Sequence, residues 1–457
     1  MKNNVFDVRS FGAVSDGKTL NSKAVQLAID ECAKQGGGKV VFSKGDYCLS
    51  TVFLKSNVEI VIKKDARILG SQDFYDYAPQ EKLDYPLYQD ASHSYFDCSM
   101  FVGKGCENIA IYGGGIIDMR SVWDKDNVRD MVHRGPKCIA LRECKNVDIH
   151  GIEIYHATDL AIYFAGCDNV EIHHLKMRVY IDGISPDNSS NVNIYNCDIE
   201  TGDDGIVFKS SYTLNKLGVC ENIIVKNCRV KSRCSALKFG TETNGGFRNI
   251  YIENVDIRET RITGIAIESV DGAIIDCITI KNVSMRNVGA PLFIHLGNRM
   301  RGPEGRKAGK IENILLENIV AEGPYEPYEC IEWRYSSFVK KDTLQYPWQT
   351  EVAKQEWGTP FTNNVCGLKD NPLRNITLKN VKFITQGGIQ EYQREVPENA
   401  DGYPEVFVYG HTLPAHGIYF RYVDGLILEN VEMQTYLPDV REAIVFDGCR
   451  NLSFLGT

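Results

Sequence analysis

An internal repeat constrains the fold of this chain more than any other feature. Each instance has, with small variations, an Asn, then Val or Ile, alternating apolar residues, a turn and a second short strand. The instances begin at Cys106, Cys144, Cys167, Ser190, Cys220, Arg248, Glu312, Arg374 and Asp424. The spacings are 23, 22, 31 and 27 residues between successive members of the series Asn146, Asn169, Asn191, Asn222 and Asn249. A period in the twenties with two-residue alternation inside each unit is typical of a solenoid.

The residue types favour strands in this solenoid. Leucine-rich repeats have a similar length but need regularly placed leucines, whereas Val, Ile, Phe and Tyr dominate here. The sequence therefore predicts an all-β chain, a parallel β-helix in which each coil has two or three short strands and coils stack about 4.8 Å apart. We expect the recurrent asparagines at the turns, where their side chains stack from coil to coil. We interpret residues 1–457 as one β-helix domain.

The N-terminal segment, residues 1–70, differs from the repeats. A helix is predicted from Asn21 or Ser22 to Lys34, with Ala24, Leu27, Ala28 and Cys32 on one face. We expect this helix to cap the open end of the core before the first coils. Two insertions, residues 323–372 and 387–415, interrupt the repeat. The first is rich in aromatic residues and predicts either a cleft wall that stacks on sugars or a packing or dimer contact, and the second has the same ambiguity.

Charge and composition exclude several partners. The net charge is -9, so neither nucleic acid nor an anionic membrane surface is expected as a partner. No apolar run reaches the length of a membrane span. The fifteen cysteines have no paired spacing and predict buried free thiols, which favour a reducing compartment. With no signal peptide after Met1, the expectation is a cytoplasmic protein; a secreted or periplasmic protein with its signal removed is the alternative. The absence of CxxC and HExxH patterns predicts no metal site and no cofactor, and the oligomeric state is left open.

The candidate site lies between Tyr180 and Ser210. This stretch holds three carboxylates, Asp182, Asp203 and Asp204. The adjacent pair should repel, which predicts a raised pKa for one of the two. Because residues one coil apart are neighbours in a solenoid, we expect the three carboxylates to converge on one lateral face. Inverting cleavage of a glycosidic bond needs such a set: one carboxylic acid, and one carboxylate about 6.5–9.5 Å away that activates a water. A solvated Asp-Gly turn is the alternative.

Two segments of this stretch resemble the polygalacturonase type of pectin hydrolases, glycoside hydrolase family 28. Thr201-Gly202-Asp203-Asp204 matches the family's Thr-Gly-Asp-Asp, and Tyr180-Ile181-Asp182-Gly183 keeps the Asp and Gly of its Asn-Thr-Asp-Gly. The resemblance extends over nearly the whole chain. It implies a right-handed parallel β-helix and hydrolysis with inversion. It also implies that Asp203 is the general acid and that Asp182 and Asp204 position and deprotonate the attacking water.

The chain departs from the family pattern on the next two coils. Aligned by coil, the family's His falls at Ser235, and its carboxylate-binding Arg and Lys fall at Ala266 and Glu268. An Ala and a Glu cannot bind a galacturonate carboxylate. The departures therefore predict a neutral or differently placed acidic sugar beside the scissile bond, as in rhamnogalacturonan-type chains. The candidate substrate-binding residues are Lys209, Ser235, Lys238, Glu242 and Glu268. For each lysine, an exposed strand position is the alternative.

Three functions stay open at this point. The first is an inverting, exo-acting hydrolase of a pectin-related oligosaccharide. The second is a polysaccharide lyase or epimerase that would use the aspartates to hold calcium. The third is a non-catalytic glycan-binding solenoid. The histidines, among them His173, His174 and His295, either line the cleft or form hydrogen-bonded turns, and we favour the turn interpretation for each.

Overall fold

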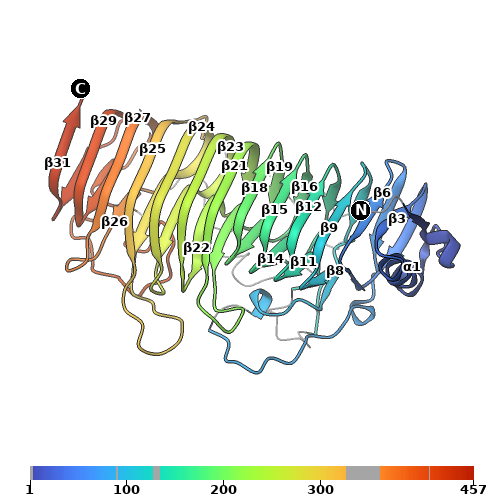
Figure 1. The fold of residues 1–457 in the computed structure, drawn as a ribbon. Helices are drawn as coiled ribbons and strands as arrows, with labels where there is room; N and C mark the ends of the chain where they lie inside the picture. Colours follow the sequence, from blue (N-terminus) through green and yellow to red (C-terminus); the bar gives the residue numbers. More distant parts are fainter. Residues whose placement is uncertain (1–3, 89–90, 127–133, 326–360, 411, 457) are drawn as a thin grey trace. The chain divides into compact units, whose positions relative to one another are not determined.

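The repeats of the sequence correspond to coils of parallel strands in a computed structural model of the chain (Figure 1). The structure describes residues 4–88, 91–126, 134–325, 361–410 and 412–456. The chain divides into two units, residues 1–202 with 211–224, and residues 203–210 with 225–457. Within each unit the strands pair in parallel, which is the arrangement of a right-handed parallel β-helix.

The first unit contains one α-helix in its described part, α1 (Ser22–Lys34), and the single-turn helices η1 (Val8–Phe11), η2 (Phe74–Asp76) and η3 (Ala91–His93). Its strands are β1 (Val5–Asp7), β2 (Asp16–Leu20), β3 (Gly38–Phe42), β4 (Gly45–Leu49), β5 (Val52–Phe53), β6 (Val58–Ile62), β7 (Ala66–Gly70), β8 (Ser99–Lys104), β9 (Glu107–Tyr112), β10 (Ile116–Asp118), β11 (Lys137–Arg142), β12 (Lys145–His150), β13 (Glu153–Tyr155), β14 (Ile162–Ala165), β15 (Asp168–His173), β16 (Lys176–Val179), β17 (Ile184–Asp187), β18 (Ser190–Tyr195) and β19 (Asp198–Thr201).

The second unit is built from fewer and longer strands. Its strands are β20 (Ile206–Ser210), β21 (Val219–Ser232), which begins in the first unit, β22 (Ser235–Thr243), β23 (Gly246–Ser269), β24 (Ile274–Leu296), β25 (Lys310–Glu322), β26 (Asn363–Cys366), β27 (Leu373–Gly387), β28 (Ala415–Arg421), β29 (Val423–Leu437), β30 (Glu442–Asp447) and β31 (Arg450–Leu455).

Three strands make one coil in the first unit, because a strand typically pairs with the strand three places further along. Ile149 of β12 pairs with Ile172 of β15, which pairs in turn with Ile194 of β18. All three side chains are fully buried, so each coil places the same apolar position above the last and the stack forms a continuous core. The helix α1 packs against β1, β3 and β5 near the start of this stack, as predicted for a cap.

The apolar face of α1 differs from the predicted one. The buried residues are Val25, Ala28, Ile29 and Cys32, while Leu27 is 49% exposed. The true stripe follows the i, i+3, i+4, i+7 pattern of an amphipathic helix, and Leu27 falls outside it. The predicted bounds of the helix are confirmed, and the predicted face is wrong by about one residue of rotation.

The recurrent asparagines form side-chain ladders at the turns. The Asn169 amide donates to Asn146 Oδ1 at 2.8 Å, and Asn146 donates to Asn108 at 2.9 Å. These residues have φ near +55°, a left-handed conformation that Asn tolerates better than most residues. A second ladder joins Asn430, Asn380, Asn318 and Asn282 in the second unit. The predicted structural role of the repeat asparagines is confirmed.

The insertion at 387–415 is packed against the second unit. Val406, Val408, Tyr409 and Leu413 form an apolar cluster with Ala266, Phe293 and Tyr419. Because this cluster anchors the insertion on β23, β24 and β28, neighbouring polar residues of the insertion have fixed positions. Of the other insertion, 323–372, residues 326–360 and most of its aromatic side chains lie outside the described residues.

The cysteines behave as small apolar residues. All fourteen that the structure describes are free thiols, and eleven of them are buried. This confirms the expected buried thiols for that part of the chain, while the compartment stays a prediction. Among the described residues, no helix has both the length and the apolar character needed to cross a membrane.

Candidate active site

Asp203 and Asp204 stand at the turn before β20, in the second unit. Asp203 is partly exposed, whereas Asp204 is buried and accepts a hydrogen bond on Oδ1 from the Ser235 backbone N–H at 3.1 Å. Ser232 Oγ donates to the Asp203 backbone carbonyl at 2.6 Å, which fixes the turn. At Gly205 a Cβ would lie 2.6 Å from the Ala236 carbonyl oxygen, so only glycine permits the close approach of the next coil. The pair thus consists of one partly exposed aspartate and one buried aspartate.

Lys238 is the centre of a buried charge cluster around Asp204. Its Nζ lies 2.9 Å from Glu405 Oε1, 3.6 Å from Asp204 Oδ2 and 3.8 Å from Glu268 Oε1. Each of these four side chains is at least nine-tenths buried. The strand partner of Lys238 is Ala266, whose methyl group leaves space for the lysine chain to extend. One ammonium therefore lies among three carboxyl groups.

Burial and these neighbours set the ionisation of the cluster. Burial raises the pKa of Asp204 above its ordinary value, with Lys238 and Lys209 acting in the opposite direction. Burial likewise raises the pKa of Glu268 well above the usual range. Burial alone would lower the pKa of Lys238, but Asp204, Glu268 and Glu405 together raise it well above its ordinary value. The predicted raised pKa within the aspartate pair is confirmed for Asp204, although burial is its main cause and repulsion by Asp203 is not.

Two further buried ion pairs adjoin this cluster. Lys209 Nζ lies 3.1 Å from Glu242 Oε2, and both side chains are more than nine-tenths buried. Arg299 pairs with Asp271 through two contacts, Nε to Oδ1 at 3.0 Å and Nη2 to Oδ2 at 2.5 Å. Glu242 is among the groups that raise the pKa of Arg299, which places the two ion pairs in one electrostatic environment.

The predicted site residues fall in both units. Lys209, Lys238 and Glu242 are buried and ion-paired, so the alternative of exposed lysines on a strand is wrong. Glu268 is fully buried with its carboxyl group facing Lys238. Asp182 belongs to the first unit, where it is buried and its backbone carbonyl accepts a hydrogen bond from Ala161 at 2.9 Å. The convergence of Asp182 with the other carboxylates stays a prediction.

Sequence reasoning missed Glu405 and Arg299 as neighbours of the site, and it left open whether Tyr403 lines a cleft or makes a packing contact. Glu405 and Tyr403 come from the insertion at 387–415, and Arg299 comes from the segment after β24. Tyr403 is 58% exposed, yet desolvation by its surroundings raises the pKa of its phenol. The charges that also act on this pKa belong to Lys238, Glu405, Glu242 and Asp203, so an open aromatic ring lies beside the acidic cluster. Only the interruption of the repeat pointed to this part of the site.

His295 is not a turn histidine. It lies within β24, fully buried, with Nδ1 3.2 Å from the Tyr409 hydroxyl and its ring stacked on Phe293. Burial lowers the pKa of His295 to about 3, so the imidazole is neutral at ordinary pH. The turn interpretation of this residue is wrong, because its sequence context is a strand of alternating buried residues.

The acidic pair also belongs to a group of possible metal ligands. Ligand atoms of Asp203, Asp204 and Cys234 lie within 4.8 Å of one another. Burial raises the pKa of the Cys234 thiol well above its usual range. Calcium takes six to eight oxygen ligands, so two carboxylates beside a protonated thiol form a poor calcium site.

The β-helix and its paired aspartates define the class of the protein as a solenoid glycoside hydrolase. The chain belongs to the glycosyl hydrolases family 28, whose sequence model matches residues 41–325. A probable polygalacturonase of Vitis vinifera is 25% identical over 263 residues, which cover 54% of this chain and 53% of that protein. An exo-poly-alpha-D-galacturonosidase of Dickeya chrysanthemi is 25% identical over 439 residues, 83% of this chain and 71% of the relative. The chain thus spans about half the length of the first relative.

Solved structures support the fold assignment. The crystal structure of a hyperthermoactive exopolygalacturonase from Thermotoga maritima superposes with a TM-score of 0.68. The match covers 95% of this chain and 92% of that one, at 20% sequence identity. At this identity the likeness establishes the architecture, and the chemistry has to be argued from the residues.

Proposed function

We propose that this protein is an inverting, exo-acting hydrolase of pectin-derived oligosaccharides. The observation that carries the proposal is the different environment of the two adjacent aspartates, one partly exposed and one buried beside Lys238. Inverting hydrolysis requires one carboxyl group that donates a proton and another that accepts one. Asp203, which solvent and substrate can reach, suits the donor. Asp204, with Lys238 favouring its ionised form, suits the acceptor. A carboxylate oxygen of Asp203 lies within 4.8 Å of one of Asp204, which is closer than the separation of about 6.5–9.5 Å usual in inverting hydrolases, so the configuration of the first product is the decisive measurement.

The reaction then balances without a cofactor. Asp203 donates its proton to the glycosidic oxygen as the bond from that oxygen to the anomeric carbon breaks. Asp204, with Asp182 as its expected partner, takes a proton from the water that attacks the anomeric carbon from the opposite face. The product is a sugar of inverted configuration, and the two aspartates exchange their protonation states for the next turnover through solvent.

The site's cations favour a neutral sugar beside the scissile bond. Lys209, Lys238 and Arg299 each already contact a buried carboxylate, Glu242, Glu405 and Asp271 respectively. Pairing a substrate carboxylate with Lys209 or Lys238 would compete with a buried ion pair, which is costly. Arg299 keeps Nη1 without a hydrogen bond to any residue that the structure describes, so it is the one of these three cations that could also bind an acidic group. A rhamnogalacturonan-type oligosaccharide, with neutral sugars between acidic ones, meets this condition better than homogalacturonan.

Two observations support exo-action. The Dickeya relative is named for exo-cleavage of polygalacturonan. In addition, the packed insertion at 387–415 brings Tyr403 beside the acidic cluster, and an exposed aromatic ring is a suitable platform for a terminal sugar.

Time-resolved analysis of products from end-labelled oligosaccharides tests the proposal. We expect release of one sugar unit at a time from a rhamnose-containing oligosaccharide, with the inverted anomer visible by NMR in the first seconds. A ladder of mid-length products from polygalacturonan would contradict both the substrate and the exo mode. An unsaturated product that absorbs in the ultraviolet would instead indicate a lyase, and binding without turnover would indicate a glycan-binding protein.

A further inference from the structure

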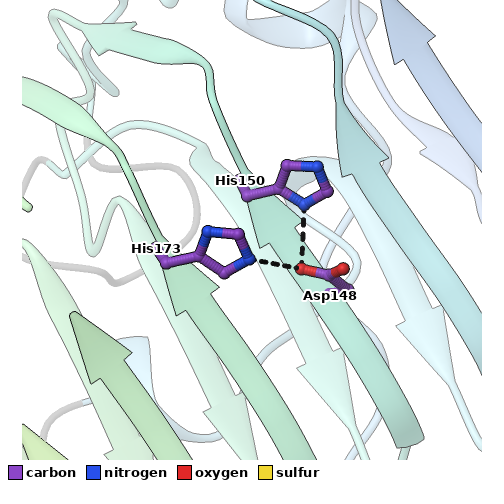
Figure 2. Close-up of side chains that lie close together, drawn as sticks. All are labelled: Asp148, His150 and His173. Atoms are coloured by element: carbon purple, nitrogen blue, oxygen red, sulfur yellow. Dashed lines mark hydrogen bonds and ion pairs between the residues drawn. The ribbon is translucent and has the colours of Figure 1, made fainter. Parts of the chain in front are cut away.

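A second group of polar side chains lies on the outside of the first unit. Figure 2 shows Asp148 and His150 of β12 and His173 of β15 pointing toward one another. His150 and His173 are direct partners in the parallel register, and Asp148 lies two residues before His150, on the same face of the strand. The coil stacking alone therefore brings two imidazoles and a carboxylate together across 25 residues of sequence from Asp148 to His173.

The three donor atoms converge on one point. His150 Nδ1 lies 2.9 Å from Asp148 Oδ1, and His173 Nε2 lies 3.3 Å from the same oxygen. One ligand atom from each residue falls within 4.8 Å of the others. Two imidazole nitrogens and one carboxylate oxygen are the ligands that zinc and nickel prefer, and three protein ligands leave coordination positions for water.

The neighbours of His173 fix its tautomer. His174 Nδ1 lies 2.8 Å from His173 Nδ1, so one of these nitrogens donates a proton to the other. The Asn196 side-chain amide donates to His174 Nε2 at 3.1 Å, so a neutral His174 carries its proton on Nδ1 and is the donor to His173. His173 then carries its own proton on Nε2, facing Asp148 Oδ1. A metal ion bound there would displace this proton, as metal binding to histidine requires.

Two carboxylates lie side by side at this group. Asp148 and Glu171 are direct partners in the parallel register of β12 and β15. They give the site a negative charge when the imidazoles are neutral. A divalent cation bound there would also screen the carboxylates from each other.

Coordination requires both imidazole rings to turn out of the stack that they form with Tyr112 and Tyr195. The His150 and His173 rings stack face to face, with centroids 4.6 Å apart and planes 5° apart. Bonds of about 2.0–2.1 Å to both nitrogens require the rings to tilt toward the metal. The side chains are 30% and 18% exposed, and that of Asp148 is 43% exposed, so solvent-side movement is available.

We propose that Asp148, His150 and His173 form a binding site for a divalent transition metal, zinc or nickel, that joins β12 to β15. The site is separate from the catalytic proposal, because none of its residues belongs to the acidic cluster. Local metal motifs place ligands a few residues apart, so this site, assembled across coils, was not visible in the sequence.

Isothermal titration of untagged, EDTA-treated protein with zinc chloride and then nickel chloride near neutral pH tests the proposal. We expect one metal per chain and a rise in Tm on saturation. Asp148→Asn and the double variant His150→Gln, His173→Gln should each weaken binding by at least about tenfold and remove the rise in Tm. Asparagine has nearly the same shape as aspartate, and the side chain of Asp148 is 43% exposed, so the Asp148→Asn protein should fold normally.

His156→Gln is the matched control. His156 Nδ1 also contacts a single aspartate, Asp118, at 2.8 Å, but among the residues that the structure describes no second imidazole completes a three-ligand group there. This variant should bind metal as the unmodified protein does. Failure of the unmodified protein to bind zinc or nickel at millimolar concentration would overturn the proposal. So would binding that survives in the folded double variant, since the metal would then be held elsewhere.

Discussion

Replacing Lys238 with methionine should shift the acid limb of the pH–activity profile to higher pH. The proposed base, Asp204, must be ionised to accept a proton, and burial already raises its pKa. The Lys238 ammonium, 3.6 Å from Asp204 Oδ2, opposes that effect. Methionine has a similar length and no charge, so the variant removes the charge while filling most of the space. The carboxyl group of Asp204 should then hold its proton to a higher pH.

The magnitude follows from Coulomb's law at the observed distance. Two unit charges 3.6 Å apart interact by about 4.6 kcal/mol at an effective dielectric constant near 20, and by about 1.2 kcal/mol at that of water. Since one pKa unit corresponds to about 1.4 kcal/mol, the acid limb should move upward by between about one and three pH units. At low pH the variant should lose activity where the unmodified enzyme is still active, and at higher pH the difference should narrow.

The assay is kcat/KM against pH on an oligosaccharide substrate, with circular dichroism to verify folding. Lys226→Met is the control, because Lys226 is a half-exposed lysine of β21 paired with Glu253 and outside the cluster. The Lys226→Met variant should leave the dependence of kcat/KM on pH unchanged. Glu405→Gln should move the acid limb the opposite way, since the Glu405 carboxylate raises the pKa of Asp204. A folded Lys238→Met protein with an unmoved acid limb would refute the role of Lys238.

Three other outcomes are expected. Asp203→Asn should abolish turnover and leave the Tm nearly unchanged, because an amide has no acidic proton to donate; near-normal activity would remove Asp203 as the acid. Glu268→Gln should shift the pH profile less than Glu405→Gln does, because burial raises the pKa of Glu268 well above its usual range and disfavours its charged form; an equal shift would contradict this. The pKa of His295 is about 3 in the folded protein and about 6.5 in the unfolded chain. The free energy of unfolding therefore contains the full contribution of the neutral imidazole above pH 6.5, and it falls by up to about 5 kcal/mol as the pH drops to 3. His295→Phe should flatten this fall in denaturant titrations, and an unchanged pH dependence would contradict the buried neutral imidazole.

The fold was largely predictable from the sequence, because every coil of a solenoid repeats the same arrangement of short strands and turns. Two signals indicate the parallel strands and the stacked core of the structure. They are the spacing of the repeat asparagines and the two-residue alternation of apolar residues within each repeat. The face of α1 was less predictable, since Ala24 and Leu27 fit an apolar stripe about as well as Val25 and Ile29 do. The packing against β1 and β3 decides between the two stripes.

The charge cluster was only partly predictable. The motif and the coil alignment identified Asp204, Lys238 and Glu268 as residues of one region. The contact between Lys238 and Glu405 joins residues 167 positions apart, and the intervening insertion lacks the repeat pattern that would set its register. The position of Glu405 could therefore not be predicted from the sequence. Without Glu405, an exposed strand position explained Lys209 and Lys238 as well as a role in the site did.

Charge balance explains why an insertion belongs to the proposed active site. Three carboxyl groups surround the single ammonium of Lys238, and Glu268, the most buried of the three, has its pKa raised well above the usual range. Because burial disfavours the charged form of Glu268, Asp204 and Glu405 are the main competitors for this one positive charge. Glu405 is the nearer, at 2.9 Å against 3.6 Å, so the field that Lys238 exerts on Asp204 depends on where Glu405 lies. Because the apolar cluster of Val406 and its neighbours holds that part of the insertion on the β-helix, its packing contributes to the pKa of the proposed base, whose main cause is burial.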